Sequence, residues 1–480
     1  MAVESGGGNA TSSADADYAI TGAGEIVATD QSGDTGAIED TGATGETDDA
    51  GEPRPTVDAT VERVGATDAL RYDLSITDLS ALERVTLVVG RDATVIESEG
   101  LSVRKRGGRT WLRPADGADS ATLGIRTTVS GADRPQGSGE FFATDEWVLG
   151  PVPLVELRWG TAGERERTLP LGDDLLGSSE TTAGQRYALV GEQRTTTVSA
   201  ADGQIRIVQP ADTTTRAGSD ELTAALAAAA ERLDVGDRGD DVLLFALGSP
   251  ARRGGESFPG RDEGWVHADA GLDDPNSVWF HEYVHTRQEF VLTDGMHWFR
   301  EASAEYYAAR LAYEQGRITE SEMHTHLGGS AVHATLADPA TWTDRSVPYT
   351  KGARVVWLLD EKIRLSTDGE RSMVDVVRRL NEHDGPVSRG DFRDAVAAVA
   401  GHRMDGWIDR YVDNGVPVAS FYPNEPARSG PFAAVLSLPV GARRAVSFLG
   451  VAVLLSGLVS VPLYRYLDRL EREDPPSRPV

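Results

Sequence analysis

The sequence predicts an α+β protein with an N-terminal antiparallel β-sandwich, a mainly helical domain after it and a transmembrane helix near the C-terminus. Alternating apolar runs, separated by Gly, Asp and Pro, predict the sandwich in residues 55–178. Apolar residues at helical spacing through most of 275–425 predict the helices. An uncharged apolar stretch at 445–464 predicts the membrane span. The length of 480 residues also exceeds that of one compact core.

The composition excludes several classes of function. The chain has 76 Asp and Glu against 47 Lys and Arg, a net charge of −29, and no Cys. An acidic surface repels phosphates, so we expect no nucleic-acid partner. The lack of Cys excludes disulfides, thiolate metal ligands and a cysteine nucleophile. Because nearly all the bases are Arg, the composition is typical of a halophile with a GC-rich genome, and we expect a haloarchaeal source.

The folded part is expected to begin near residue 55. Residues 1–54 consist mainly of Gly, Ala, Ser, Thr and Asp, which bury too little apolar surface to fold, so we expect a disordered acidic segment. Runs such as LRYDLSIT, RVTLVVG and EWVLGPVPLVELRW then alternate as sandwich strands do. The second domain, 179–426, should hold strands at RYALVGE, QIRIVQP and DDVLLFALG and helices at SDELTAALAAAAERL, ARVVWLLDEKIRL and DFRDAVAAVAG.

The C-terminal part predicts a single-pass membrane anchor. After a linker at 427–444, AVSFLGVAVLLSGLVSVPLY (445–464) gives 20 residues without a charge, and a charged tail follows at 465–480. As a helix it spans roughly 30 Å, the thickness of the hydrocarbon core. A buried core helix is the alternative. We expect insertion into the lipid bilayer of the cell membrane, with the tail inside and the large domains outside, although MAVESGGG lacks the basic and apolar regions of a signal peptide.

The motif HEYVH predicts a metal site. On a helix, His281 and His285 are four residues apart and face the same way, so both imidazoles can reach one ion. Zinc accepts neutral imidazole and, in catalytic sites, three protein ligands and a water. Glu282 would then take the proton of that water as general base. The alternative is an ordinary buried helix that carries two polar residues by chance.

Two glutamates downstream are candidates for completing the site. Glu301 and Glu305 are also four residues apart, in HWFREASAEYYAARLAYEQ. A second helix packed on the first would present Glu301 as third ligand, and Glu305 could accept the outer N–H of a ligating histidine. The small alanines around them allow a close approach of two helices. The alternative for both acids is an exposed helical face.

These motifs resemble those of a known family. HEYVH followed by WFREASAEYY is similar to the gluzincin metallopeptidases, such as thermolysin, the aminopeptidase N family, the glycyl aminopeptidases and peptidase MA-like domains. The resemblance implies a thermolysin-like catalytic domain in which His281, His285 and Glu301 bind Zn²⁺, Glu282 is the base and Glu305 supports a ligand. The gap between His285 and Glu301 is a few residues shorter than in aminopeptidase N.

A second segment extends the resemblance. SVPYTKGARVVWLLDEKI, at 346–363, is similar to an aminopeptidase N segment whose tyrosine donates a hydrogen bond to the oxyanion. Carried over, this is Tyr349, a phenol that would stabilise the transition state more than the substrate. The alternative is a capped aromatic residue ahead of an amphipathic helix.

One departure leaves the specificity open. Aminopeptidase N relatives carry G-x-M-E-N before HExxH, and its glutamate binds the free amine of the substrate. The corresponding GRDEGWVHADAGLDDPNS lacks this motif. Asp262 or Glu263 could hold an ammonium group, and 264–269 could still form the edge strand that pairs with a peptide. The choice between aminopeptidase and endopeptidase therefore stays open.

The other histidines lack partner spacing and are expected at structural, surface or core positions: His267, His297, His324, His326, His333, His383 and His402.

The sequence thus predicts a membrane-anchored zinc metallopeptidase that hydrolyses a peptide or protein substrate by metal-activated water. The alternative is a metal-binding module of the same fold that serves in binding or assembly at the membrane without peptidase activity. Glu282 and Tyr349 favour the enzyme, because a scaffold needs neither.

Overall fold

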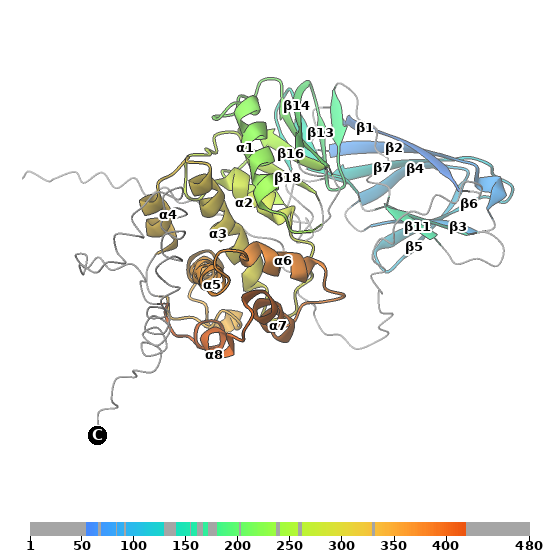
Figure 1. Ribbon diagram of the computed structural model, residues 1–480. Helices are drawn as coiled ribbons and strands as arrows, with labels where there is room; N and C mark the ends of the chain where they lie inside the picture. Colours follow the sequence, from blue (N-terminus) through green and yellow to red (C-terminus); the bar gives the residue numbers. More distant parts are fainter. Residues whose placement is uncertain are drawn as a thin grey trace, which may run out of the picture. The chain divides into compact units, whose positions relative to one another are not determined.

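The computed structural model describes residues 54–418, and Figure 1 labels its helices and strands. Short segments within this range are not described: 66–68, 83, 91–92, 129–140, 154, 161–166, 171–179, 201–202, 237–240, 258–261 and 329–331. The expected segment 1–54, apart from its last residue, and all of 427–480 lie outside the described residues.

Two antiparallel sheets form the N-terminal part. Sheet A has the order β1 (Thr56–Arg63), β2 (Ala69–Thr77), β7 (Ala121–Thr128), β4 (Ala93–Glu99). Sheet B has the order β11 (Arg167–Pro170), β10 (Val155–Gly160), β3 (Arg84–Val89), β6 (Arg109–Pro114), β5 (Leu101–Arg106). Every second side chain of β2 is buried, as with Tyr72, Leu74 and Ile76, and these pack in one core with Leu87 and Leu157 of sheet B. The alternation seen in the sequence therefore produces the expected sandwich.

A third sheet contains strands from both sides of the domain boundary expected at 178/179. Sheet C has the order β12 (Thr181–Ala183), β13 (Tyr187–Val190), β9 (Val148–Pro151), β8 (Phe142–Ala143). β13 pairs antiparallel with β9, with Tyr187 opposite Pro151 and Val190 opposite Val148. The chain on the two sides of that boundary is thus hydrogen-bonded into one sheet.

The fourth sheet supports the helices. Sheet D has the order β14 (Gln193–Ala200), β15 (Gly203–Pro210), β16 (Val242–Leu247), β18 (Glu263–His267), β17 (Gly255–Ser257). β16 is parallel to both neighbours, and all six of its residues are buried. An uninterrupted apolar strand is typical of a parallel strand that is covered on both faces. Here Val242, Leu244 and Ala246 pack with the helices, and the alternate residues pack with sheet C.

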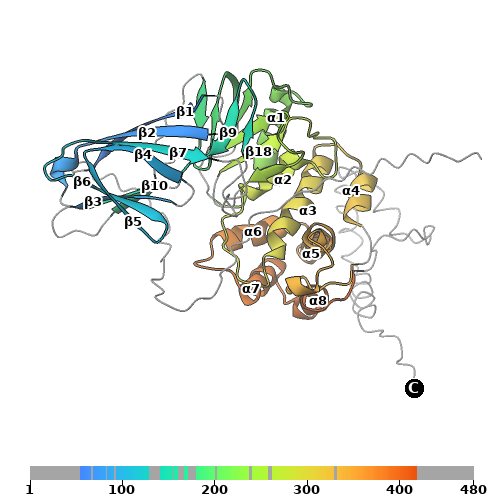
Figure 2. The ribbon, with the colours of Figure 1, turned by 180° about the vertical axis from the view of Figure 1, so that it is seen from behind.

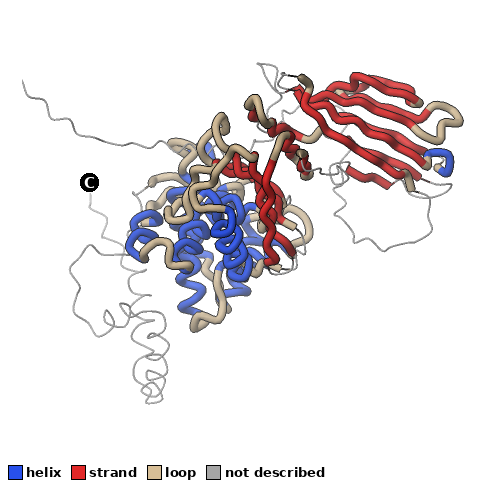
Figure 3. Tube along the Cα trace, turned by 90° about the horizontal axis from the view of Figure 1, so that it is seen from above, coloured by secondary structure: helices blue, strands red, loops and turns tan. Residues whose placement is uncertain are grey.

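Eight α-helices lie in the described part of the chain. They are α1 (Ser219–Arg232), α2 (Val278–His285), α3 (Trp298–Glu314), α4 (Glu320–Leu327), α5 (Ala353–Ser366), α6 (Met373–Asn381), α7 (Arg389–Ala400) and α8 (Asp405–Ile408). α1 and α2 contact sheet D, and α3 packs between α2 and α5, which can be followed from both sides in Figures 1 and 2. Figure 3, with helices in blue and strands in red, shows that the α-helices form one group beside sheet D, whereas the short 3-10 turn Leu79–Ala81 lies at the far end of the sandwich.

Sheets C and D are joined by an apolar cluster and by a buried carboxylate. Phe142 and Trp147 of the first part pack with Phe245 and Trp265 of sheet D. Beside them, Glu263 of β18 accepts backbone N–H bonds from Arg186 at 2.9 Å and Tyr187 at 2.8 Å. Burial raises the pKa of Glu263 to about 7, although these N–H groups oppose the rise.

No helix among the described residues is long and apolar enough to cross a membrane. The span expected at 445–464, with its linker and charged tail, falls outside them.

Glu263 makes the stability of the fold depend on pH. Its folded pKa of about 7 lies above the ordinary 4.5, so between these values the folded carboxyl keeps a proton that the unfolded chain has lost. Its contribution to stability is therefore largest at low pH and falls as the pH rises through this window. We expect the unfolding free energy of the wild type, relative to Glu263→Gln, to fall by about 3 kcal/mol between the two pH values. Urea titrations at several pH values measure this, and parallel pH profiles for the two proteins would contradict it.

Candidate metal centre

The helix that carries HEYVH is buried throughout. Every residue of α2 (Val278–His285) is buried, because the apolar VWF and YV hold it between sheet D and α3. At its end, the Thr286 hydroxyl donates to the carbonyl of Tyr283 at 2.7 Å. Imidazole and carboxylate groups on such a helix are removed from water and therefore need partners within the protein.

The second helix supplies those partners. α3 (Trp298–Glu314) places fully buried alanines, such as Ala302 and Ala304, where it packs against its neighbours. A Cβ on Gly352 would lie 2.8 Å from the Cβ of Ala302, so α3 and the segment before α5 are also in close contact. The expected small residues therefore let α3 bring both of its glutamates to α2.

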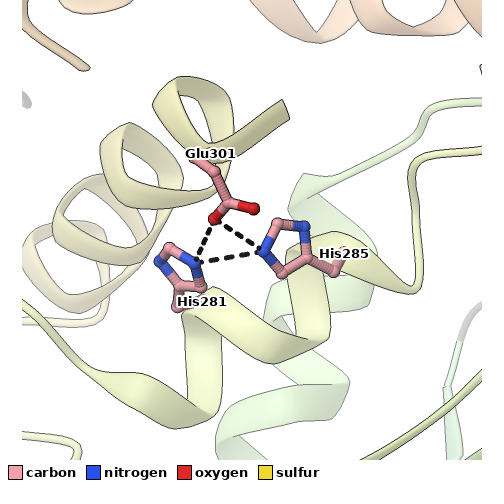
Figure 4. Close-up of side chains that lie close together, drawn as sticks. All are labelled: His281, His285 and Glu301. Atoms are coloured by element: carbon pink, nitrogen blue, oxygen red, sulfur yellow. Dashed lines mark hydrogen bonds and ion pairs between the residues drawn. The ribbon is translucent and has the colours of Figure 1, made fainter. Parts of the chain in front are cut away.

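Three ligand atoms meet between α2 and α3, as Figure 4 shows. The Nε2 atoms of His281 and His285 are 3.1 Å apart. The Oε2 atom of Glu301 lies 3.4 Å from the first and 3.3 Å from the second. Among the described residues these three form the group of side chains suited to hold a metal ion.

Gln288 determines the tautomer of His285. The Gln288 side-chain N–H₂ donates to the carbonyl of Arg300 at 3.0 Å and to the hydroxyl of Ser303 at 2.9 Å. Its Oε1 therefore points the other way, 2.9 Å from Nδ1 of His285. An amide oxygen only accepts, so Nδ1 of His285 carries the proton, and Nε2 of the neutral ring has a lone pair.

Glu305 determines the orientation of His281 in the same manner. Its Oε2 lies 3.2 Å from Nδ1 of His281, and the carboxylate is almost fully buried. Hydrogen bonding to His281 and His326 holds the pKa of Glu305 below its usual range, although burial opposes this. An ionised carboxylate accepts the Nδ1 proton and leaves Nε2 of His281 to face Glu301.

Two imidazole nitrogens and a carboxylate oxygen thus point towards one place, and they need a positive charge there. For zinc bonds of 2.0–2.1 Å, tetrahedral geometry puts ligand atoms about 3.3 Å apart, which agrees with the separations found here. Neutral imidazole and carboxylate are ligands that zinc accepts, and three of them leave a fourth position for water or substrate. The residues therefore fit a catalytic zinc ion.

The electrostatics of the site also favour a bound cation. Burial lowers the pKa of His281, but hydrogen bonds to Glu301 and Glu305 outweigh it and raise this pKa to about 10. Burial opposes ionisation of Glu301, yet the two imidazoles hold its pKa well below the usual range. The two glutamates thus stabilise positive charge at the imidazole rings. A proton supplies part of this charge, and a divalent ion supplies all of it.

Glu282 faces the short strand β17. A Cβ on Gly255 would lie 2.6 Å from Cγ of Glu282, so glycine is what leaves room for the carboxylate. The buried hydroxyl of Ser257 makes no hydrogen bond of good geometry. It nevertheless lies near Glu282 and favours the ionised form of that carboxylate. Burial raises the pKa of Glu282, with the neighbouring imidazoles opposing. A carboxylate with a raised pKa is suited to take a proton near neutral pH.

Tyr349 lies on the other side of His281. It belongs to the π-helical turn Pro348–Gly352, and its ring stacks on that of His281 with centroids 5.8 Å apart. Its buried hydroxyl has no hydrogen-bond partner of good geometry among the described residues. Burial, and after it the charge of Glu301, raise the pKa of Tyr349, so the phenol stays protonated. A buried donor that lies beside Glu301 but makes no hydrogen bond of good geometry is available to a ligand.

The edge strand is not the expected one. Residues 264–269 were considered as an edge strand, but β18 lies between β16 and β17. Among the described residues, β17 (Gly255–Ser257) forms the edge of sheet D on this side, and β14 forms the other. The prediction was wrong because the strand order depends on a short, Gly-rich segment without apolar alternation. The side chain of Glu256 on β17 is turned towards Tyr187, whose hydroxyl donates to it at 2.8 Å.

The two acids considered for binding an ammonium group are engaged elsewhere. Asp262 accepts from Arg287 at 3.2 Å, and Glu263 accepts the two backbone N–H groups of sheet C. Neither therefore belongs to the group around His281.

Two residues that contact the site were not singled out in the sequence. Gln288 follows His285 by three residues, and this spacing is a signal that could have been used. His326, expected as a surface or core residue, has Nε2 2.6 Å from Oε1 of Glu305. No local spacing relates α3 to α4, so the sequence holds no comparable signal for His326.

Comparisons with known proteins give the fold. No protein-family model and no curated protein matches the sequence. The chain is similar to the crystal structure of an aminopeptidase N family protein from Idiomarina loihiensis, with 13% identity, a TM-score of 0.53, and coverage of 75% of this chain and 76% of that one. For an M1 zinc metallopeptidase from Deinococcus radiodurans the values are 14%, 0.47, 77% and 95%. The first likeness confirms the expected gluzincin, aminopeptidase-like fold.

Proposed function

We propose that this protein is a zinc metallopeptidase that hydrolyses peptide bonds. The observation that carries the proposal is the convergence of His281, His285 and Glu301 between two buried helices, with both outer imidazole nitrogens held by acceptors. When bound, zinc would lower the pKa of a water molecule and polarise the substrate carbonyl.

The protein groups have separate tasks in this reaction. Glu282 takes the proton of the attacking water and passes it to the leaving amine. The phenol of Tyr349 donates to the oxyanion that develops on the carbonyl, which stabilises the transition state more than the ground state. β17 offers the outer edge of sheet D, where an extended peptide can add as a further strand beside Glu282. A binding or assembly module without activity would need neither Glu282 nor Tyr349 in these positions.

We propose further that residues 445–464 anchor the protein in the cell membrane, with the folded domains outside. Twenty residues without a charge, with Arg443 and Arg444 before them and Arg465 after them, support this.

The general base can be tested separately from the metal. Glu282→Gln keeps the size of the side chain but removes its basicity, so we expect full zinc content and no measurable hydrolysis. His285→Ala and Glu301→Ala are the matched controls, and they should lose zinc together with activity. Peptide-library digestion in high salt and metal analysis of the same samples measure both. Full activity of the Glu282→Gln protein would contradict the assignment of Glu282 as general base.

Tyr349→Phe removes the oxyanion donor and little else. Its hydroxyl lies beside Glu301 but makes no hydrogen bond of good geometry, so we expect stability and zinc content to change little. We expect kcat to fall by roughly two to three powers of ten, as for the loss of one oxyanion donor, and KM to change little. Tyr307→Phe on α3, another buried phenol without a hydrogen-bond partner of good geometry, is the control. Unchanged kcat in Tyr349→Phe would exclude the role.

The anchor can be tested by fractionation. We expect the full-length protein in the membrane pellet after an alkaline carbonate wash, and the variant that lacks 441–480 in the supernatant. A shortened protein that still sediments with the membranes would refute the anchor at 445–464.

A further inference from the structure

Glu305 lies between two imidazoles that come from different helices. Its Oε2 is 3.2 Å from Nδ1 of His281 on α2, and its Oε1 is 2.6 Å from Nε2 of His326 on α4. The side chain of Glu305 is 3% exposed, whereas that of His326 is 27% exposed. A buried carboxylate therefore joins the metal centre to a histidine that reaches solvent.

The position of His326 is fixed by its helix. α4 begins with a capping box, in which the Thr319 hydroxyl accepts from the backbone N–H of Glu322 and the Glu322 carboxylate accepts from that of Thr319. Met323 and Leu327 are buried in the core of the helical part. His326 follows Met323 by three residues, so it lies on the same face of α4 and is directed towards α3.

Both oxygens of Glu305 need partners in this position. With His281 alone, one oxygen would be buried without a donor, which is costly for an ionised group. It would also leave the carboxylate free to rotate about its last bond. With His326 on the other oxygen, the plane of the carboxylate is fixed and Oε2 is held against Nδ1 of His281.

We infer that His326 is a positioning residue of the metal centre: by donating to one oxygen of Glu305 it holds the other against Nδ1 of His281, and so sets the affinity for Zn²⁺. The inference rests on the proposed zinc site. Groups that hold a ligating histidine from outside typically change metal affinity 10–100-fold when removed. His326 acts one residue further from the ion, so we expect the lower end of that range.

The measured quantity is the zinc dissociation constant of the metal-stripped full-length protein, obtained by competition with a chromophoric chelator in high salt. We expect His326→Ala to weaken binding about tenfold, and His326→Gln, which keeps an N–H donor, to restore most of the affinity. His324→Ala is the matched control: it lies on the same helix but stacks on Trp357, with ring centroids 5.1 Å apart. Thermal melting of the metal-free proteins checks that all of them fold.

A double-mutant cycle decides whether His326 acts through Glu305. In a Glu305→Ala background, His326→Ala should cause no further loss of zinc affinity. The same tenfold loss in that background, or wild-type affinity in the single variant, overturns the inference. If the wild type itself binds no zinc, the proposed function falls together with the inference; if it binds zinc and His326→Ala binds it equally well, the inference alone falls.

Discussion

The structure of the site depends on the direction in which two buried imidazoles present their lone pairs. Gln288 and Glu305 accept from the Nδ1 atoms of His285 and His281, so both Nε2 atoms are directed to Glu301. Without a cation, three acceptors would be crowded together in a largely buried region, which is unfavourable. A cation between α2 and α3 would offset this cost and allow the two helices to pack closely.

The parts of the site that the sequence predicted are those fixed by short-range geometry. His281 and His285, like Glu301 and Glu305, are four residues apart, and a helix places such pairs on one face wherever the helix lies. The structure brings the first three together and sets Glu305 behind His281. Tyr349 could be proposed only from a resemblance, and its buried phenol beside Glu301, which makes no hydrogen bond of good geometry, supports that role on independent grounds.

What the sequence did not predict depends on contacts between distant segments. His326 meets Glu305 because α4 is folded back on α3, and no periodic pattern encodes that distance. The strand order of sheet D places the three-residue β17 outside β18, although β17 has little apolar content to mark it as a strand. The alternation in β2 and the uninterrupted apolar run of β16 did predict their strands. Burial on one face gives alternating apolar residues, and burial on both faces gives a continuous apolar run.

The pairing within sheet C limits where the polypeptide can be cut into separately folding parts. β9 and β13 lie on opposite sides of residue 178 in the chain but share a ladder, and the aromatic cluster with Phe142 and Trp147 covers Phe245 and Trp265. A polypeptide beginning at 179 would lose half of that ladder and leave this aromatic surface open to solvent. Tyr187, which donates to Glu256 of β17, would also lose its partner strand β9. The strands of sheet C before and after residue 178 thus belong to one hydrophobic unit with sheet D, and a cut at 178/179 would divide that unit.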